Sequence, residues 1–135
     1  MILKEPYVRI NGMLASLMLL IFSYCFFYPE LASQGLTIPS SCEGMPELYC
    51  RSRGLSRAFY QIMHSNFEKA AALNKYSMSI FIFFMSQFFA RLILTTLYIR
   101  TKSNRLIVLD SIFSAAYFIY VFFPLTFLYY WLWGK

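Results

Sequence analysis

The sequence has few charged residues and few of the side chains that build catalytic or metal sites. Only 13% of its 135 residues are charged, about half of the roughly 25% found in soluble domains. It contains one histidine, His64, and one aspartate, Asp110. A metal site needs three or four closely spaced ligands, so we expect neither a metal nor a cofactor. No nucleophile–base arrangement and no phosphate-binding glycine loop can be assembled, so we expect that the protein is not an enzyme.

The sequence also lacks a polar stretch long enough for a separate soluble domain, which needs at least about 50 residues. Apolar residues make up 59% of the chain and aromatic residues 21%, more than one small water-soluble core can bury. The net charge is +6, but the basic residues lie between apolar segments and form no continuous basic face. We therefore expect membrane lipids and no nucleic acid as partners. The predicted fold is an all-α integral membrane protein with one membrane domain over residues 1–135.

Three apolar segments are long enough to cross a bilayer, which takes about 20 residues of helix. They cover residues 10–28, 76–99 and 106–133. We interpret the first as a retained anchor, because its apolar run is long for a signal peptide and a good small-residue cleavage pattern is missing. The third is longer than the hydrocarbon core is thick, so tilt, protrusion or a bend at Pro124 must absorb the excess.

The loop of residues 29–75 separates the first two spans. It consists of 46 residues, 29–74, and the flanking Lys75. Glycine, proline and serine in its first half are typical of turns. Further on, apolar residues recur at helical spacing, which predicts one amphipathic helix over residues 57–75 with Ser56 as its N-cap. Because no glycine or proline interrupts it, this helix either continues into the second span or lies on the membrane surface. Its predicted apolar face consists of Phe59, Ile62, Met63 and Phe67.

The basic residues predict how the chain is oriented. They are densest at the N-terminus and in the short hairpin between the second and third spans, which favours a cytoplasmic position for both in a bacterial inner membrane. The loop and the C-terminus then lie outside the cytoplasm. In that oxidising compartment we expect a structural disulfide between Cys42 and Cys50 of the loop. No Cys-x-x-Cys pair is present, which argues against redox catalysis.

Arginines of the same loop are candidate contact residues. Arg51, Arg53 and Arg57 either contact anionic lipid headgroups or an acidic partner, or belong to a solvated segment balanced by the glutamates of the loop.

Arg91 is a charged residue inside the second span, where a charge costs at least ~2.5 kcal/mol. The second and third spans form an antiparallel hairpin with its turn near Lys102 and Ser103. In that hairpin Arg91 and Asp110 differ in depth by about four residues, or roughly 6 Å. An arginine side chain covers most of that distance, so we predict an intramembrane ion pair between them. Snorkelling of Arg91 to the membrane surface is the alternative.

Three functional classes fit these features. The first is a non-enzymatic inner-membrane protein that recognises another membrane protein or an invading agent, as immunity proteins and membrane components of phage defence do; the likeness is one of size and topology only. The second is an accessory subunit of a larger membrane complex, such as a transporter, an oxidase or a secretion machine. The third is a homo-oligomeric channel with Arg91 near its pore. We expect the first.

Overall fold

The computed structural model describes residues 5–38, 50 and 52–123. Every regular element within these ranges is a helix. Three helices are long, namely α1 (Pro6–Phe26), α5 (Ser77–Thr101) and α6 (Asn104–Phe122). Three are short, namely α2 (Tyr28–Ser33), α3 (Leu55–Met63) and α4 (Phe67–Leu73).

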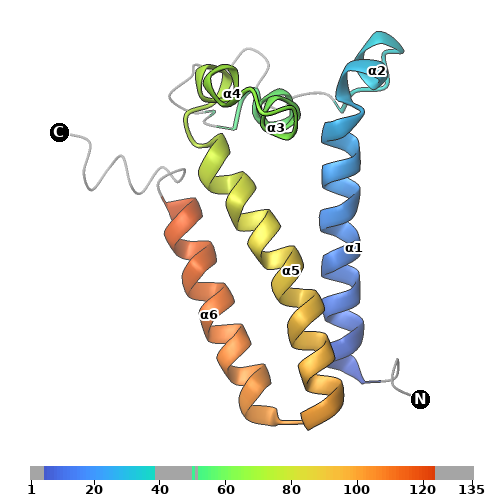
Figure 1. Ribbon diagram of the computed structural model, residues 1–135, viewed down its shortest axis with the longest axis vertical. Helices are drawn as coiled ribbons and strands as arrows, with labels where there is room; N and C mark the ends of the chain where they lie inside the picture. The colour runs from blue at the N-terminus through green and yellow to red at the C-terminus, as the bar shows by residue number, and fades with distance from the viewer. Residues whose placement is uncertain (1–4, 39–49, 51, 124–135) are drawn as a thin grey trace, which may run out of the picture.

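The long helices correspond to the three predicted spans. They contain 21, 25 and 19 residues, and each is long and apolar enough to cross a membrane. In Figure 1, α5 lies between α1 and α6 and contacts both. The predicted third span continues to residue 133, and its part beyond residue 123 lies outside the described residues. An all-helical fold with three candidate membrane-spanning helices is therefore present.

Each long helix buries only a narrow stripe. In α1 the buried residues Val8, Asn11, Ala15 and Met18 are spaced alternately by three and four positions, which places them on one helical face. Most of the remaining surface of α1 is apolar and exposed. Large exposed apolar faces are unusual for a water-soluble helix and are what a bilayer-facing helix requires.

A two-residue turn joins α5 to α6 and makes them antiparallel neighbours. Lys102 takes the left-handed conformation, with φ of 47°, and ends α5 by donating its backbone N–H to the carbonyl of Tyr98 at 2.7 Å. Ser103 is extended, and α6 begins at the next residue. Because the turn is short, residues at similar distances from it on the two helices lie side by side.

α3 and α4 form a cap, the name used below for these two helices, across the end of the bundle opposite the α5–α6 turn (Figure 1). Phe59 of α3 is 2% exposed, and its ring packs edge-to-face against Phe81 at 5.3 Å and Phe84 at 6.2 Å. The main apolar core therefore lies at the capped end. Its buried members are Cys25, Ala58, Phe59, Ile62, Ala70, Ile80, Phe83 and Val121.

The single amphipathic helix predicted for residues 57–75 is wrong, because two helices occupy this segment. α3 ends in a Schellman motif, in which Ser65 has φ of 61° and donates its N–H to Ile62 O at 3.0 Å. The N–H of Asn66 bonds to Gln61 O at 2.8 Å. Glycine normally marks this left-handed position, and serine gives no such signal. The reversal leaves Phe67 51% exposed, so it does not share the buried face of α3.

The predicted N-cap of this segment is also wrong. α3 begins at Leu55, and its N-cap is Gly54 rather than Ser56. Gly54 has φ of 77°, and a Cβ there would lie 3.0 Å from the carbonyl oxygen of Leu73. Glycine is therefore required both by its conformation and by the close approach of the end of α4.

The cap does not continue into α5. Asn74 is extended and ends α4, and its side-chain Oδ1 accepts the backbone N–H of Tyr76 at 2.9 Å. Its Nδ2 donates to the carbonyl of Arg53 at 3.1 Å. This buried asparagine thus separates the two helices and ties the start of the cap to its end.

Phe59→Ala is expected to destabilise the protein by about 3–5 kcal/mol, because it leaves a cavity in the core beneath the cap. Phe67→Ala removes the same atoms from a half-exposed side chain and is the matched control, with a much smaller effect. Thermal unfolding of both variants in the same detergent measures the difference. Equal losses would mean that the cap is not packed on the bundle through Phe59.

Candidate functional site

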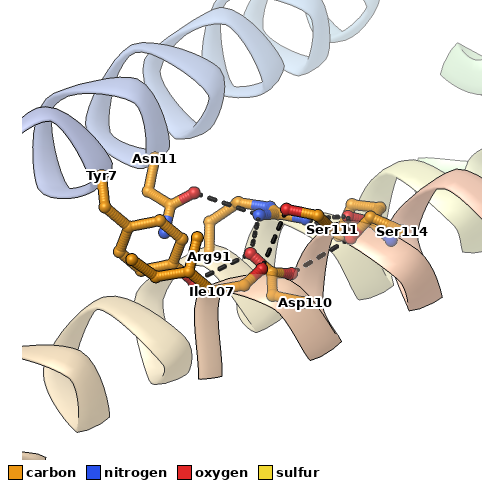
Figure 2. Close-up of polar contacts among 8 residues, drawn as sticks. Tyr7, Asn11, Arg91, Ile107, Asp110, Ser111 and Ser114 are labelled. Carbon is orange, nitrogen blue, oxygen red and sulfur yellow. Dashed lines mark hydrogen bonds and ion pairs between the residues drawn. The ribbon is translucent and has the colours of Figure 1, made fainter. Parts of the chain in front are cut away.

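Polar side chains of all three long helices meet inside the bundle, in the half that ends at the α5–α6 turn. In Figure 2, Tyr7 and Asn11 of α1 point toward Arg91 of α5, and Asp110 and Ser114 of α6 approach it from the other side. Gln87, one helical turn before Arg91, also contacts it. This group is called the Arg91 cluster below. It comprises Tyr7, Asn11, Gln87, Arg91, Asp110 and Ser114.

Arg91 uses both terminal nitrogens of its guanidinium group. Nη1 donates to Asp110 Oδ2 at 2.6 Å and to Asn11 Oδ1 at 3.0 Å. Nη2 donates to Gln87 Oε1 at 2.8 Å and to the hydroxyl of Ser114. The fork of the guanidinium group therefore binds one acceptor from α1, one from its own helix and two from α6.

The carboxylate of Asp110 is equally well surrounded. Its Oδ2 accepts a hydrogen bond from the Tyr7 hydroxyl at 2.8 Å in addition to the Arg91 contact. Its Oδ1 accepts from the Ser114 hydroxyl at 3.1 Å. Arg91 and Asp110 are only 6% and 7% exposed. Further hydrogen bonds of this kind reduce the cost of burying an ion pair.

Two buried donors of the cluster remain without a hydrogen-bond acceptor among the described residues. These are Asn11 Nδ2 and Arg91 Nε. Asn11 is 1% exposed, so it is held in the seam between α1 and α5 although one of its donors is unused. The positions of the side chains in the cluster are thus set mainly by the hydrogen bonds of the guanidinium and carboxylate groups.

One contact between aromatic rings and two polar contacts connect the cluster to the end of the bundle. The rings of Tyr7 and Tyr98 lie 4.8 Å apart, and the Tyr98 hydroxyl donates to Glu5 at 3.4 Å. Glu5 is in turn 4.0 Å from the ammonium group of Lys102, in the turn. These contacts join the start of α1 to the end of α5 and to the α5–α6 turn.

The structure places the other predicted site residues separately. Arg53 and Arg57 are exposed, just before and within α3. Cys50 is buried, but Cys42 and Arg51 lie outside the described residues, so the disulfide and the role of Arg51 remain predictions.

His64 has a packing role in the structure. Its ring stacks on Phe26 at 5.6 Å and lies 4.2 Å from the ring of Tyr60. Its Nδ1 is 2.9 Å from the Tyr60 carbonyl oxygen. Among residues 5–38, 50 and 52–123, no three His, Cys, Asp or Glu side chains are grouped to hold a metal ion.

The sequence analysis paired Arg91 with Asp110 and missed the other members of the cluster. Gln87 precedes Arg91 by four residues, and Ser114 follows Asp110 by four, so each lies one helical turn from a charge on the same face. That spacing is a usable signal. Asn11 and Tyr7 carry no such signal, because only the packing of α1 against α5 brings them to the pair.

No protein-family model matches this sequence, and searches of curated proteins and of solved structures found no significant match. The function must therefore be argued from the chain's own residues.

Arg91→Leu and Asp110→Leu are each expected to destabilise the protein by about 3–5 kcal/mol, because each leaves the opposite charge buried without its partner. The double variant removes both charges and should recover most of the loss. Accumulation in membranes and thermal stability after detergent extraction measure all three variants, with Arg100→Leu as an exposed control. A double variant no better than the worse single variant would show that the two charges do not stabilise the protein as a pair.

Proposed function

We propose that this chain is a multi-pass protein of a bacterial inner membrane that acts without catalysis, by recognising another membrane protein or an invading agent through its cap. Membrane components of immunity and phage defence work in this general way. In the proposed orientation the N-terminus and the α5–α6 turn face the cytoplasm, and the cap faces outward. The three apolar helices and the basic residues around the turn support this arrangement.

The observation that carries the proposal is that the cap is a folded platform. A connection between two spans needs no buried residues of its own, yet this one buries Ala58, Phe59 and Ile62 against the bundle. Its opposite side exposes Arg57, and Glu68 and Lys69 are exposed on α4. A fixed, charged surface of this kind is suited to binding a macromolecule, because little conformational entropy is lost when the partner docks.

The Arg91 cluster weighs against a channel whose pore is lined by Arg91. Both terminal nitrogens of the guanidinium group already bind acceptors of the same chain. A pore-lining arginine would face water along its path instead. Asp110 of the same chain also balances the buried charge of Arg91. An obligate accessory subunit would often need a helix of its partner for this, and this chain does not.

Photo-crosslinkers placed at Arg57 and Glu68 test the proposal in cells of the source organism. We expect a discrete adduct with one other membrane-associated protein from both cap positions, and none from the same crosslinker at Met13, on the exposed face of α1. An Arg57→Glu change should weaken the adduct formed from position 68 by tenfold or more without altering accumulation of the protein.

Other outcomes separate the alternatives. Adducts from Met13 alone would indicate association through the spans, as in an accessory subunit, and would contradict recognition by the cap. Failure of the chain to purify alone as a defined species would point the same way. Ion flux through liposomes that contain only this protein would instead support a channel.

The proposed orientation places Cys42 and Cys50 outside the cytoplasm, where a disulfide persists. Cys25 is a free, buried cysteine. Denatured protein from thiol-blocked membranes should therefore carry one alkyl group before reduction and three after it, as measured by mass spectrometry. Cys42→Ser should raise the first number to two. Three alkyl groups before reduction would contradict both the disulfide and the orientation.

A further inference from the structure

A groove of about 670 Å³ runs between α5 and α6 on the side of the bundle, within the roughly 300–1,000 Å³ range of ligand-binding pockets. Its walls are mainly apolar and include Leu94, Leu106, Leu109 and Phe113. Leu109 and Phe113 are 55% and 71% exposed, so the groove is open along its side. Because both helices are candidate spans, this opening faces the hydrocarbon of a bilayer.

The two ends of the groove differ in chemistry. At the α5–α6 turn it is lined by Thr101, Ser103 and Arg105. Ser103 and Arg105 can donate hydrogen bonds to an anion, whereas the Thr101 hydroxyl already donates to the Leu97 carbonyl at 3.0 Å. Away from the turn the walls are mainly apolar, although Gln87, Asp110 and Ser114 of the Arg91 cluster also line them, and Tyr117 is the furthest lining residue along α6. From Leu106 to Tyr117 the groove extends for about 16 Å along the helix, close to the ~15 Å thickness of one leaflet. An anionic lipid head at the turn, with one acyl chain along the apolar walls, matches this order.

The charge at the turn favours an anionic head. Arg105 is exposed, and the ion pairs in the described part of the chain, Arg91–Asp110 and Lys102–Glu5, do not include it. Arginine is the residue best suited to grip a phosphate, because its guanidinium group binds two oxygens at once. The positive charge of Arg105, which has no ion-pair partner among the described residues, therefore favours an anionic lipid over a zwitterionic one.

We propose that the groove between α5 and α6 is a binding site for one anionic phospholipid of the leaflet at the α5–α6 turn. The phosphate lies at Arg105 and Ser103, and one acyl chain lies along Leu106, Leu109 and Phe113. This site is separate from the cap and does not depend on what the cap recognises. A second copy of the chain is the competing occupant, and the experiment distinguishes it by mass.

Native mass spectrometry of the detergent-purified protein, titrated with phosphatidylglycerol or phosphatidylcholine, tests the proposal. We expect one phosphatidylglycerol to bind per chain, at concentrations at which phosphatidylcholine does not. Arg105→Gln should weaken phosphatidylglycerol binding by about tenfold, the loss of one charge-assisted contact. The matched control is Arg100→Gln, which removes the same charge from the same end but from a residue outside the groove, and it should bind like the unaltered protein.

A second variant tests the position of the acyl chain. Leu109→Trp adds bulk to the wall of the groove at an exposed residue, so the helix should still fold while binding of phosphatidylglycerol falls. Equal weakening by the two glutamine substitutions would overturn the proposal in favour of general attraction to a basic surface. If Leu109→Trp bound phosphatidylglycerol as well as the unaltered protein does, the proposed position of the acyl chain would be wrong. A dimer that retains no lipid would assign the groove to a second copy of the protein.

Discussion

The buried charge of Arg91 is the constraint on which the arrangement of the three long helices depends. A guanidinium group inside an apolar bundle must find acceptors on the neighbouring helices, since leaving it unpaired costs several kcal/mol. Here α1 supplies Asn11, α6 supplies Asp110 and Ser114, and α5 itself supplies Gln87. Because these bonds require particular distances, they fix the rotation and the relative depth of all three helices. Contacts between apolar stripes alone would permit one helix to slide along another by one helical turn.

The two ends of the bundle are held together by different interactions. Near the α5–α6 turn the contacts are polar, from the Arg91 cluster to the Glu5–Lys102 ion pair. At the other end they are apolar, with Phe59 of the cap inserted beside Phe81 and Phe84. Polar bonds fix the register of the helices, and the apolar core is formed around the cap. The cap is thus supported by helices whose positions are set elsewhere, which suits a surface that presents charged side chains in a constant arrangement.

Much of this architecture could be predicted from the sequence, for physical reasons. An apolar run of about 20 residues predicts a spanning helix because lipid leaves the backbone few alternatives. The pair of Arg91 and Asp110 could be predicted because two opposite charges inside neighbouring apolar segments have few other partners. The break at Ser65 could not, since its left-handed conformation is stabilised by the surrounding fold and serine has no local preference for it. Asn11 was missed because its role follows from the packing of α1 on α5, which helical periodicity does not specify.

The Arg91 cluster and the proposed lipid site share residues, so lipid binding there would be linked to stability. Gln87, Asp110 and Ser114 belong to the cluster and also line the groove. An acyl chain along Leu106, Leu109 and Phe113 would lie beside them and keep water from the ion pair, whose attraction increases as the local dielectric constant falls. By linkage, a ligand that binds only the folded bundle stabilises it, and the stabilisation grows with the logarithm of the free ligand concentration once that exceeds Kd. The ion pair therefore serves as the central contact between the long helices, and its Asp110 lines the groove. A lipid bound there would reinforce the same interaction that sets the register of these helices.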